Sequence, residues 1–150
     1  MIRTKRVFLK RADEDGYRVL VDRKWPLGIR KESAALDYWA KELAPSDALR
    51  EFYQHDPKRW MSFRARFREE LKASPAAKAT LITLAALSKT KNVTLVYGSR
   101  EERRNAAAVV QDAVEALVLS PVPSSAQDKH AHSTRRRDRS RLKAFPPHVR

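Results

Sequence analysis

The side chains best suited to chemistry follow directly after two segments that have the composition of β-strands. Asp22 and Arg23 come after the β-branched and aromatic run 17–21, and Tyr97 closes the apolar run 93–97. Ligands in parallel α/β sheets bind beyond the carboxyl ends of the strands, so two parallel strands would bring both ends to one edge. The sequence therefore predicts a pocket for an anionic, phosphate-bearing small molecule or nucleotide, lined by Asp22, Arg23, Trp25, Tyr97, Ser99 and Arg100.

The segment after residue 97 also has the pattern of a helix start. Ser99 and Glu102 have the spacing of a capping box, in which each side chain satisfies a free main-chain N–H group. The positive end of a helix dipole favours an anion, and Arg100 could add fork-shaped donors for a phosphate. The competing structural interpretation is that Asp22 and Arg23 form an internal ion pair and that Ser99 only caps the helix.

Two tryptophans have different expected roles. Trp25 stands beside Pro26 in a segment without regular structure, and loop aromatics near strand ends often shape ligand pockets. We therefore expect Trp25 to face the ligand. Trp39 is expected in the core, on the apolar face of a helix that begins after Ser33 and carries Leu36, Trp39, Ala40 and Leu43.

His55 and Asp56 suggest acid–base chemistry, because histidine titrates near neutral pH. Asp56 also has the position of a helix cap before Pro57, which is a structural explanation of the pair. A small hydrolase or transferase would use Asp22 or His55 as the base and Arg23 as the electrostatic stabiliser. No nucleophile, base and orienting residue form a recognisable pattern, and no metal-ligand spacing appears, so no metal is predicted.

The arginines offer an alternative function, nonspecific nucleic-acid binding. The chain carries a formal net charge of +14, which attracts polyanions through counterion release. No DNA-reading motif accompanies this charge. In the competing interpretation the helical arginines form a solvated flank, with Glu69 and Glu70 as local partners. The arginines assigned to nucleic-acid binding are Arg64, Arg68, Arg135, Arg136 and Arg137.

These residues depend on a predicted α/β fold, with a small, mostly parallel three-stranded sheet covered by about five helices. The long helical connection between residues 21 and 93 allows the second and third strands to pair in parallel. Strands are predicted at 2–9, 17–21 and 93–97, and helices after Ser33, Ser46, Asp56, Ser74 and Ser99.

The composition divides the chain into a domain at 1–118 and a basic tail at 119–150. The domain has a net charge of +8 and the shorter tail a net charge of +6. The tail opens with prolines and serines and has few apolar residues, so burial cannot offset its ordering entropy. We therefore expect the tail to be disordered.

Several classes are excluded on composition. The chain has no cysteine, which rules out disulfides and thiolate zinc sites. No apolar run approaches the roughly 20 residues that span a bilayer, and the basic N-terminus leads into no signal-peptide core. A cytoplasmic protein without a membrane partner is expected. Neither a cofactor nor an oligomeric state follows from the sequence.

Five motifs in order resemble the YeaO-like family, a bacterial domain of unknown function (number 488). The resemblance extends from about Ile2 to Leu117 and implies a compact α/β domain without a settled activity. The motifs are the string from Asp15 to Arg23, Trp25-Pro26-x-Gly28, Leu43-Ala44-Pro45-Ser46, His55-Asp56-Pro57 and Trp60.

The chain departs from the family pattern at two places. Lys24 and Leu27 flank the Trp-Pro pair, where the family usually has leucine and arginine. Arg103 and Arg104 follow Glu102, where the family usually continues with histidine before the pattern resumes at Asn105. If that histidine serves chemistry in relatives, this chain lacks it.

Overall fold

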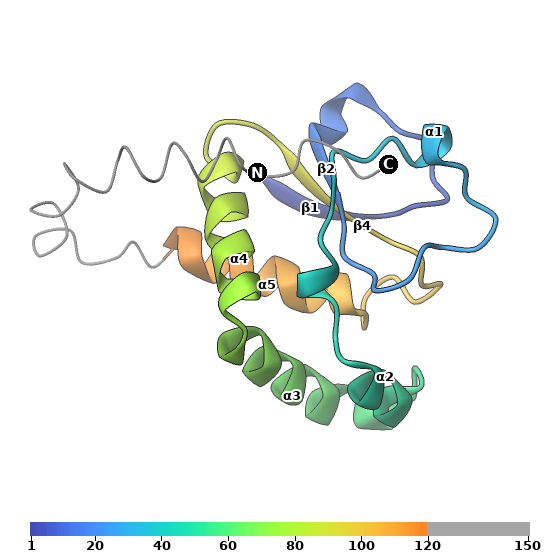
Figure 1. Cartoon of the computed structure of the whole chain (residues 1–150), viewed down its shortest axis with the longest axis vertical. Coiled ribbons are helices and arrows are strands. Elements are labelled where there is room, and N and C mark those ends of the chain that lie inside the picture. Colours follow the sequence, from blue (N-terminus) through green and yellow to red (C-terminus); the bar gives the residue numbers. More distant parts are fainter. Residues whose placement is uncertain (120–150) are drawn as a thin grey trace, which may run out of the picture.

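Four parallel strands form the centre of the molecule in the computed structural model, which describes residues 1–119 (Figure 1). The order across the sheet is β1-β4-β2-β3. The strands are β1 (Ile2–Arg6), β2 (Tyr17–Leu20), β3 (Tyr38–Trp39) and β4 (Val93–Tyr97). The helices are α1 (Lys31–Ala34), α2 (Asp47–Tyr53), α3 (Trp60–Ala73), α4 (Pro75–Ser88) and α5 (Ala106–Leu119), with 3₁₀ turns at Asp13–Asp15, Lys41–Leu43 and Pro57–Arg59.

All five residues of strand β4 are buried. It pairs in parallel with β1 on one side and with β2 on the other. The main-chain N–H of Val21 extends the second pairing by donating to the Val96 carbonyl at 3.1 Å. The continuous apolar run of β4 is typical of a strand covered on both faces, and the predicted parallel arrangement of residues 17–21 and 93–97 is confirmed.

The two faces of the sheet are covered differently. Helices α4 and α5 pack against each other and against the sheet, while α2 and α3 lie farther from it (Figure 1). This side contains the large core, which includes Val19, Leu95 and Phe67. The other face carries Leu20 and Val96 under a covering formed by the segment from residue 25 to residue 39. Among the elements of residues 1–119, no long helix covers that second face.

The helix predicted after Ser33 is wrong. Helix α1 has only four residues and ends at Ala35, whose φ of 47° lies in the left-handed region. Residues 38–39 then form β3, which pairs with β2 and gives the sheet four strands instead of three. The apolar spacing of Leu36 and Trp39 fitted a helix, but the unpaired edge of β2 offers hydrogen bonds to an extended chain. In so short a segment, the stabilisation gained from an amphipathic helix is smaller than the stabilisation gained from pairing with β2.

The capping box predicted at Ser99 is also wrong. The Ser99 hydroxyl accepts from the Glu101 N–H at 3.0 Å inside a loop, and α5 begins only at Ala106. The Asn105 side chain caps α5 by accepting from the Ala108 N–H at 2.8 Å. Asparagine is one of the preferred residues for capping a helix, and Asn105 directly precedes the apolar stripe of α5. The first turn of α5 is therefore capped by Asn105 and not by Ser99.

The remaining start signals are confirmed. Ser46 accepts from the N–H of residue 49 and begins α2, and Ser74 accepts from the N–H of residue 77 and begins α4. Asp56 caps the 3₁₀ turn that leads into α3. The predicted tail lies outside the described residues beyond Leu119. Within residues 1–119, no helix combines the length and apolar character required to cross a bilayer.

Candidate functional site

A cavity of about 550 Å³ opens beyond the carboxyl ends of β2 and β4. Because these neighbouring strands are parallel, the residues that follow each of them meet at one edge of the sheet. Helices α2 and α3 and the start of α5 close the remaining sides. The cavity is lined by Phe8, Asp22, Arg23, Lys24, Trp25, Pro26, Leu27, Pro45, Arg50, Tyr53, His55, Phe63, Tyr97, Gly98, Ser99, Asn105 and Ala106.

Asp22 joins the two strand ends at this cavity. Its Oδ2 atom accepts from the Gly98 main-chain N–H at 2.8 Å, and no group within residues 1–119 donates to its Oδ1 atom. Burial raises the pKa of Asp22, and the Gly98 N–H and the Arg50 charge offset only part of that effect. The approach at Gly98 is close, since a Cβ there would lie 3.1 Å from Oδ2 and 3.3 Å from Pro26, and these neighbours would have to shift by a few tenths of an ångström.

Two arginines line the cavity beside Asp22. The Arg23 Nε atom donates to the Pro45 carbonyl at 3.3 Å and lies 3.8 Å from the Asp47 carboxylate, which Arg50 also approaches at 3.4 Å. One exposed aspartate is thus shared by two guanidinium groups that are 40% and 45% exposed. Arg23 and Asp22 do not pair with each other, contrary to the ion pair considered from the sequence. Each arginine keeps N–H donors available.

Aromatic side chains line the rest of the cavity. The Trp25 indole N–H donates to the Ile29 carbonyl at 2.7 Å, and the ring meets Trp39 edge-on with centroids 5.5 Å apart. The Tyr53 hydroxyl donates to the Arg104 carbonyl at 2.7 Å. Burial, followed by the Glu102 charge, raises the pKa of Tyr97, so this phenol stays neutral at physiological pH. These bonds fix the rings in place.

His55 reaches the cavity through an unusual backbone. Gln54 and His55 have φ values of 46° and 57°, in the left-handed region that costs non-glycine residues free energy. This double turn ends α2 and places His55 at the cavity, while Asp56 accepts from the Lys58 N–H at 3.0 Å. The structural explanation of Asp56 as a helix cap is confirmed, and His55 remains exposed.

The structure brings most of the predicted ligand-binding residues together. Arg23, Trp25, Tyr97 and Ser99 line the cavity, as do the candidate acid–base residues Asp22 and His55. Arg100 is exposed and does not line it. The helix start predicted at Ser99 is absent, and the helix end that lines the cavity is the one capped by Asn105.

Other lining residues were not predicted from the sequence. Arg50 and Tyr53 lie three residues apart on α2, and Phe63 belongs to α3. Apolar spacing identified Tyr53 and Phe63 only as core residues. The spacing of three residues places Arg50 and Tyr53 on one face of α2, which was the one sequence feature that could have linked them. No local pattern indicated that this face of α2 would lie at the edge of the sheet.

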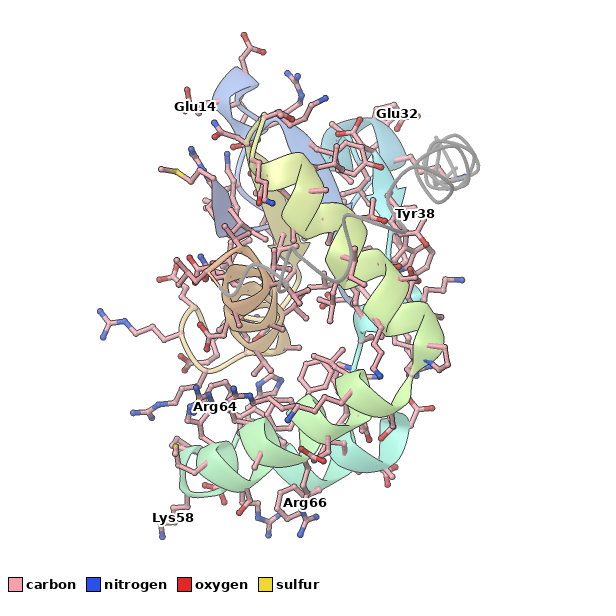
Figure 2. All side chains as sticks on the ribbon, turned by 90° about the vertical axis from the view of Figure 1, so that its left-hand side faces the viewer. Glu14, Glu32, Tyr38, Lys58, Arg64 and Arg66 are labelled. Atoms are coloured by element: carbon pink, nitrogen blue, oxygen red, sulfur yellow. The ribbon has the colours of Figure 1, made fainter. Side chains whose placement is uncertain are left out.

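The helical arginines assigned to nucleic acid lie elsewhere, on α3. Arg64 is 3.7 Å from Asp112 of α5, and Arg68 is exposed. Figure 2 shows Lys58, Arg64 and Arg66 at one end of the molecule, with Glu14 and Glu32 at the other. The predicted tail contacts, Arg135, Arg136 and Arg137, lie outside the described residues. In residues 1–119, no three His, Asp or Glu side chains gather as a metal ion would require.

Comparisons with known proteins agree with the resemblance seen in the motifs. The chain is 43% identical to an uncharacterised protein of Mycobacterium tuberculosis over 109 residues, 73% of this chain and 89% of that protein. It is 36% identical to the uncharacterised protein YeaO of Escherichia coli over 116 residues, 77% of this chain and 98% of YeaO. No solved structure matches. The family model described as the inactive DUF488-N3 subclade matches residues 1–134, and the chain belongs to that subclade of the YeaO-like family.

Proposed function

We propose that this protein binds an anionic, phosphate-bearing small molecule or nucleotide in the cavity beyond β2 and β4. The observation that carries the proposal is the combination of two arginines with free donors and an aromatic lining in one cavity. A volume of about 550 Å³ is typical of small-molecule sites. Guanidinium groups match the oxygens of a phosphate with paired hydrogen bonds, and aromatic rings provide faces for a planar base.

The charges of the lining support an anion. Arg23, Lys24 and Arg50 line the cavity, against Asp22 as the only carboxylate of the lining. Asp47 neutralises part of the arginine charge, but its side chain is 73% exposed and such surface pairs contribute little. An incoming phosphate would compete with Asp47 for both guanidinium groups without having to break a buried ion pair.

Asp22 gives the cavity one carboxylate acceptor among these donors. Its Oδ1 atom can accept from a hydroxyl or amino group of the ligand, while Oδ2 holds Gly98. A nucleotide carries both kinds of group, an anionic phosphate and neutral hydrogen-bond donors. Inorganic phosphate, by contrast, has no planar base to lie against the aromatic lining. We therefore expect nucleotides to bind more tightly than inorganic phosphate or pyrophosphate.

Binding without turnover is favoured over a hydrolase or transferase. The subclade model that matches the chain is described as inactive. Arg103 and Arg104 follow Glu102 where the family pattern usually has histidine, so this chain lacks that histidine if it serves chemistry in relatives. Asp22 and His55 both line the cavity, yet no nucleophile is hydrogen-bonded to either of them within residues 1–119. A catalytic role for Arg23 thus has less support than a binding role.

Calorimetric titration of the full chain with AMP, ADP, ATP and pyrophosphate tests the proposal. We expect Arg23→Ala and Arg50→Ala each to weaken nucleotide binding by about 10- to 100-fold, since a hydrogen bond to a charged group contributes about 1.5–3 kcal/mol. Arg11→Ala is the matched control, because Arg11 forms an exposed pair with Asp13 away from the cavity. A folded Arg23→Ala, Arg50→Ala double variant that binds every probe as the parent does would refute the site.

The arginines of α3 support a second candidate, nonspecific nucleic-acid binding. Arg66 of α3 and Arg59 of the 3₁₀ turn before it lie over the Phe52 ring, at 4.2 and 5.4 Å from its centroid. Arg64 and Arg68 also belong to α3. A helix with several accessible cations suits phosphate contacts that do not read sequence. Its test is the salt dependence described in the Discussion, and it does not involve the cavity.

A further inference from the structure

A second hollow in the molecule has a different chemistry from the cavity. Helices α3, α4 and α5 enclose a groove of about 440 Å³, and none of its lining residues belongs to the cavity at the sheet edge. We call it the helical groove. It is lined by Arg68, Leu71, Lys72, Lys78, Leu81, Ile82, Ala113, Ala116 and Leu117.

The helical groove exposes apolar surface that no element of residues 1–119 covers. Leu71 and Leu81 are buried at 4% and 6% exposure, whereas Ile82 is 60% exposed and Leu117 38% exposed. The two alanines of α5 complete a wall of small side chains. Scattered apolar residues are normal on a surface, but a concave apolar strip bounded by polar groups is typical of an interaction site.

The charged rim of the helical groove has one sign. Arg68 and Lys72 come from α3 and Lys78 from α4, and no carboxylate is among the lining residues. Lys72 lies 3.5 Å from Glu69 in a fully exposed pair, while Arg68 and Lys78 have no ion-pair partner within residues 1–119. Two unpaired cations beside exposed Ile82 and Leu117 complement a ligand that is apolar in its centre and acidic at its edges.

We propose that the helical groove binds an acidic amphipathic helix of a partner protein. A groove between helices accepts the apolar ridge of another helix, with anchors at i, i+3 or i+4, and i+7. Acidic residues that flank those anchors would meet Arg68, Lys72 and Lys78. The proposal is independent of the function proposed for the cavity.

Charge argues against the other occupants. Residues 120–150 contain 8 Lys/Arg and 2 Asp/Glu, so the chain's own C-terminal segment has the same sign as the rim. A second copy docked by two-fold symmetry would bring the rim cations of both copies together. An anionic bilayer complements the charge, but its flat surface cannot follow a concave groove.

Fluorescence anisotropy with labelled helical peptides tests the proposal on the full chain at about 150 mM salt. The probes are peptides with leucine at the anchor positions, flanked by glutamate in one set and by lysine in the other. We expect the glutamate peptides alone to bind. Ile82→Gln and Lys78→Glu should each weaken that binding at least about tenfold, as for residues at the centre of an interface.

Matched controls separate the groove from general charge and apolar effects. Met61 is 67% exposed on α3 but outside the groove, and Lys58 is an exposed cation outside it. Met61→Gln and Lys58→Glu should leave the affinity within about twofold. Equal weakening by the controls, or equal binding of both peptide sets, overturns the proposal.

Three further results overturn it by identifying another occupant. One is a dimer in sedimentation that Ile82→Gln dissociates. Another is Ile82-dependent sedimentation with phosphatidylserine vesicles when no glutamate peptide binds. The third is saturable binding of a synthetic peptide of residues 120–150 that Lys78→Glu strengthens. Circular dichroism of each variant establishes that it is folded, and Ile82 and Lys78 are exposed enough for substitution to be tolerated.

Discussion

At the scale of single residues, the Asp22 carboxylate accepts a hydrogen bond that ties two strand ends together, but its burial makes the charged form unfavourable. Its Oδ2 atom ties Gly98 to the end of β2, yet burial raises its pKa and so disfavours the charged form. A carboxylate whose folded pKa is raised contributes stability at low pH and loses that contribution as the pH rises through the folded pKa. At neutral pH, Asp22 therefore lowers the free energy of unfolding.

We predict that Asp22→Asn raises the melting temperature at pH 7. The amide oxygen can still accept from the Gly98 N–H, while the buried charge is gone. The gain should shrink as the pH falls and the parental Asp22 becomes protonated. Thermal melts of both proteins across pH 3–8 check this, with Asp13→Asn as the control because Asp13 is fully exposed. A loss of stability in Asp22→Asn at pH 7 contradicts the argument.

The same substitution separates the ligand role of Asp22 from its structural role. Asparagine places an amide donor where Oδ1 had offered an acceptor, and it keeps the bond to Gly98. If Asp22 accepts from a ligand, Asp22→Asn becomes more stable but binds nucleotide less tightly. Greater stability with unchanged binding would show that the carboxylate is only structural.

A second charged cluster lies inside the core at Arg18, whose side chain is 1% exposed. Its Nη1 atom donates to Asp15 at 2.6 Å, and its Nε and Nη2 atoms donate to the Ala34 carbonyl. Lys5 adds a 3.0 Å ion pair to Asp15. Burial raises the pKa of Asp15, but the Ala12 N–H and Lys5 outweigh that effect and hold the pKa below its ordinary value.

We predict that Asp15→Ala lowers the free energy of unfolding by about 3–5 kcal/mol at pH 7, because it leaves the Arg18 charge buried without a counterion. The pKa of Asp15 is lowered on folding, so its contribution is present above the unfolded pKa and lost as pH falls through the folded one. Urea denaturation measures the difference. Asp13→Ala, which removes a surface pair, should cost at most about 1 kcal/mol.

If Asp15→Ala does not fold, Asp15→Asn keeps the acceptors and removes only the charge. A cost for Asp15→Asn that is equal at pH 7 and at pH 3 would contradict the electrostatic explanation. That result would mean that Asp15 stabilises the fold through its hydrogen bonds and not through its charge.

At the scale of elements, one turn aligns β2 with the loop that precedes β4. Gly16 has a φ of 65°, and a Cβ there would overlap the Asn92 carbonyl oxygen. The next main-chain N–H, that of Tyr17, donates to this same carbonyl at 2.9 Å. The turn therefore fixes the first contact between the two strands whose far ends form the cavity.

We predict that Gly16→Ala destabilises the protein by more than about 2 kcal/mol, since it adds a clash to the cost of a left-handed backbone. Gly28→Ala is the matched control. Gly28 also has a positive φ, of 82°, but a Cβ there would meet nothing within 4 Å. It should cost only about 1 kcal/mol in urea denaturation. Equal costs for both variants would mean that the approach of Asn92 does not matter.

At the scale of the whole molecule, the two hollows and the net charge suit different binding partners. The cavity opens at one edge of the sheet, and the helical groove lies among α3, α4 and α5. The net charge of +14 acts on any polyanion near either of them. A binding assay at low salt would therefore mix all of these effects, and salt dependence is the measurement that separates them.

The nucleic-acid alternative predicts that the affinity of the full chain for duplex DNA falls linearly on logarithmic axes as salt rises. Replacing Arg135, Arg136 and Arg137 with alanine should reduce that slope by about 2–3, since each phosphate contact contributes about 0.9. The control replaces Lys10, Lys89 and Lys91, three exposed lysines, and removes the same charge. Equal slopes for the two triple variants would mean that DNA binding depends on net charge alone and not on contacts made by the tail arginines.

The sequence by itself determined the elements whose signals are local. Ser46, Asp56 and Ser74 begin helices because a cap needs only the next three residues, and the apolar run of β4 requires burial whatever covers it. The long helical crossover also allowed residues 17–21 and 93–97 to pair in parallel, which would bring Asp22 and Tyr97 to one edge, and the structure confirms that pairing. These inferences located most of the cavity lining, including Arg23 and Trp25.

Only the tertiary structure decided the features that depend on distant partners. Residues 38–39 form a strand because β2 has a free edge. Helix α5 starts only at Ala106, capped by Asn105, after a loop from Gly98 whose two ends line the cavity. Arg50 meets the sheet edge, and a groove opens between α3, α4 and α5, through packing that no local pattern encodes. The physical reason is that hydrogen bonds and burial across the sheet outweigh the small propensities that distinguish one short segment from another.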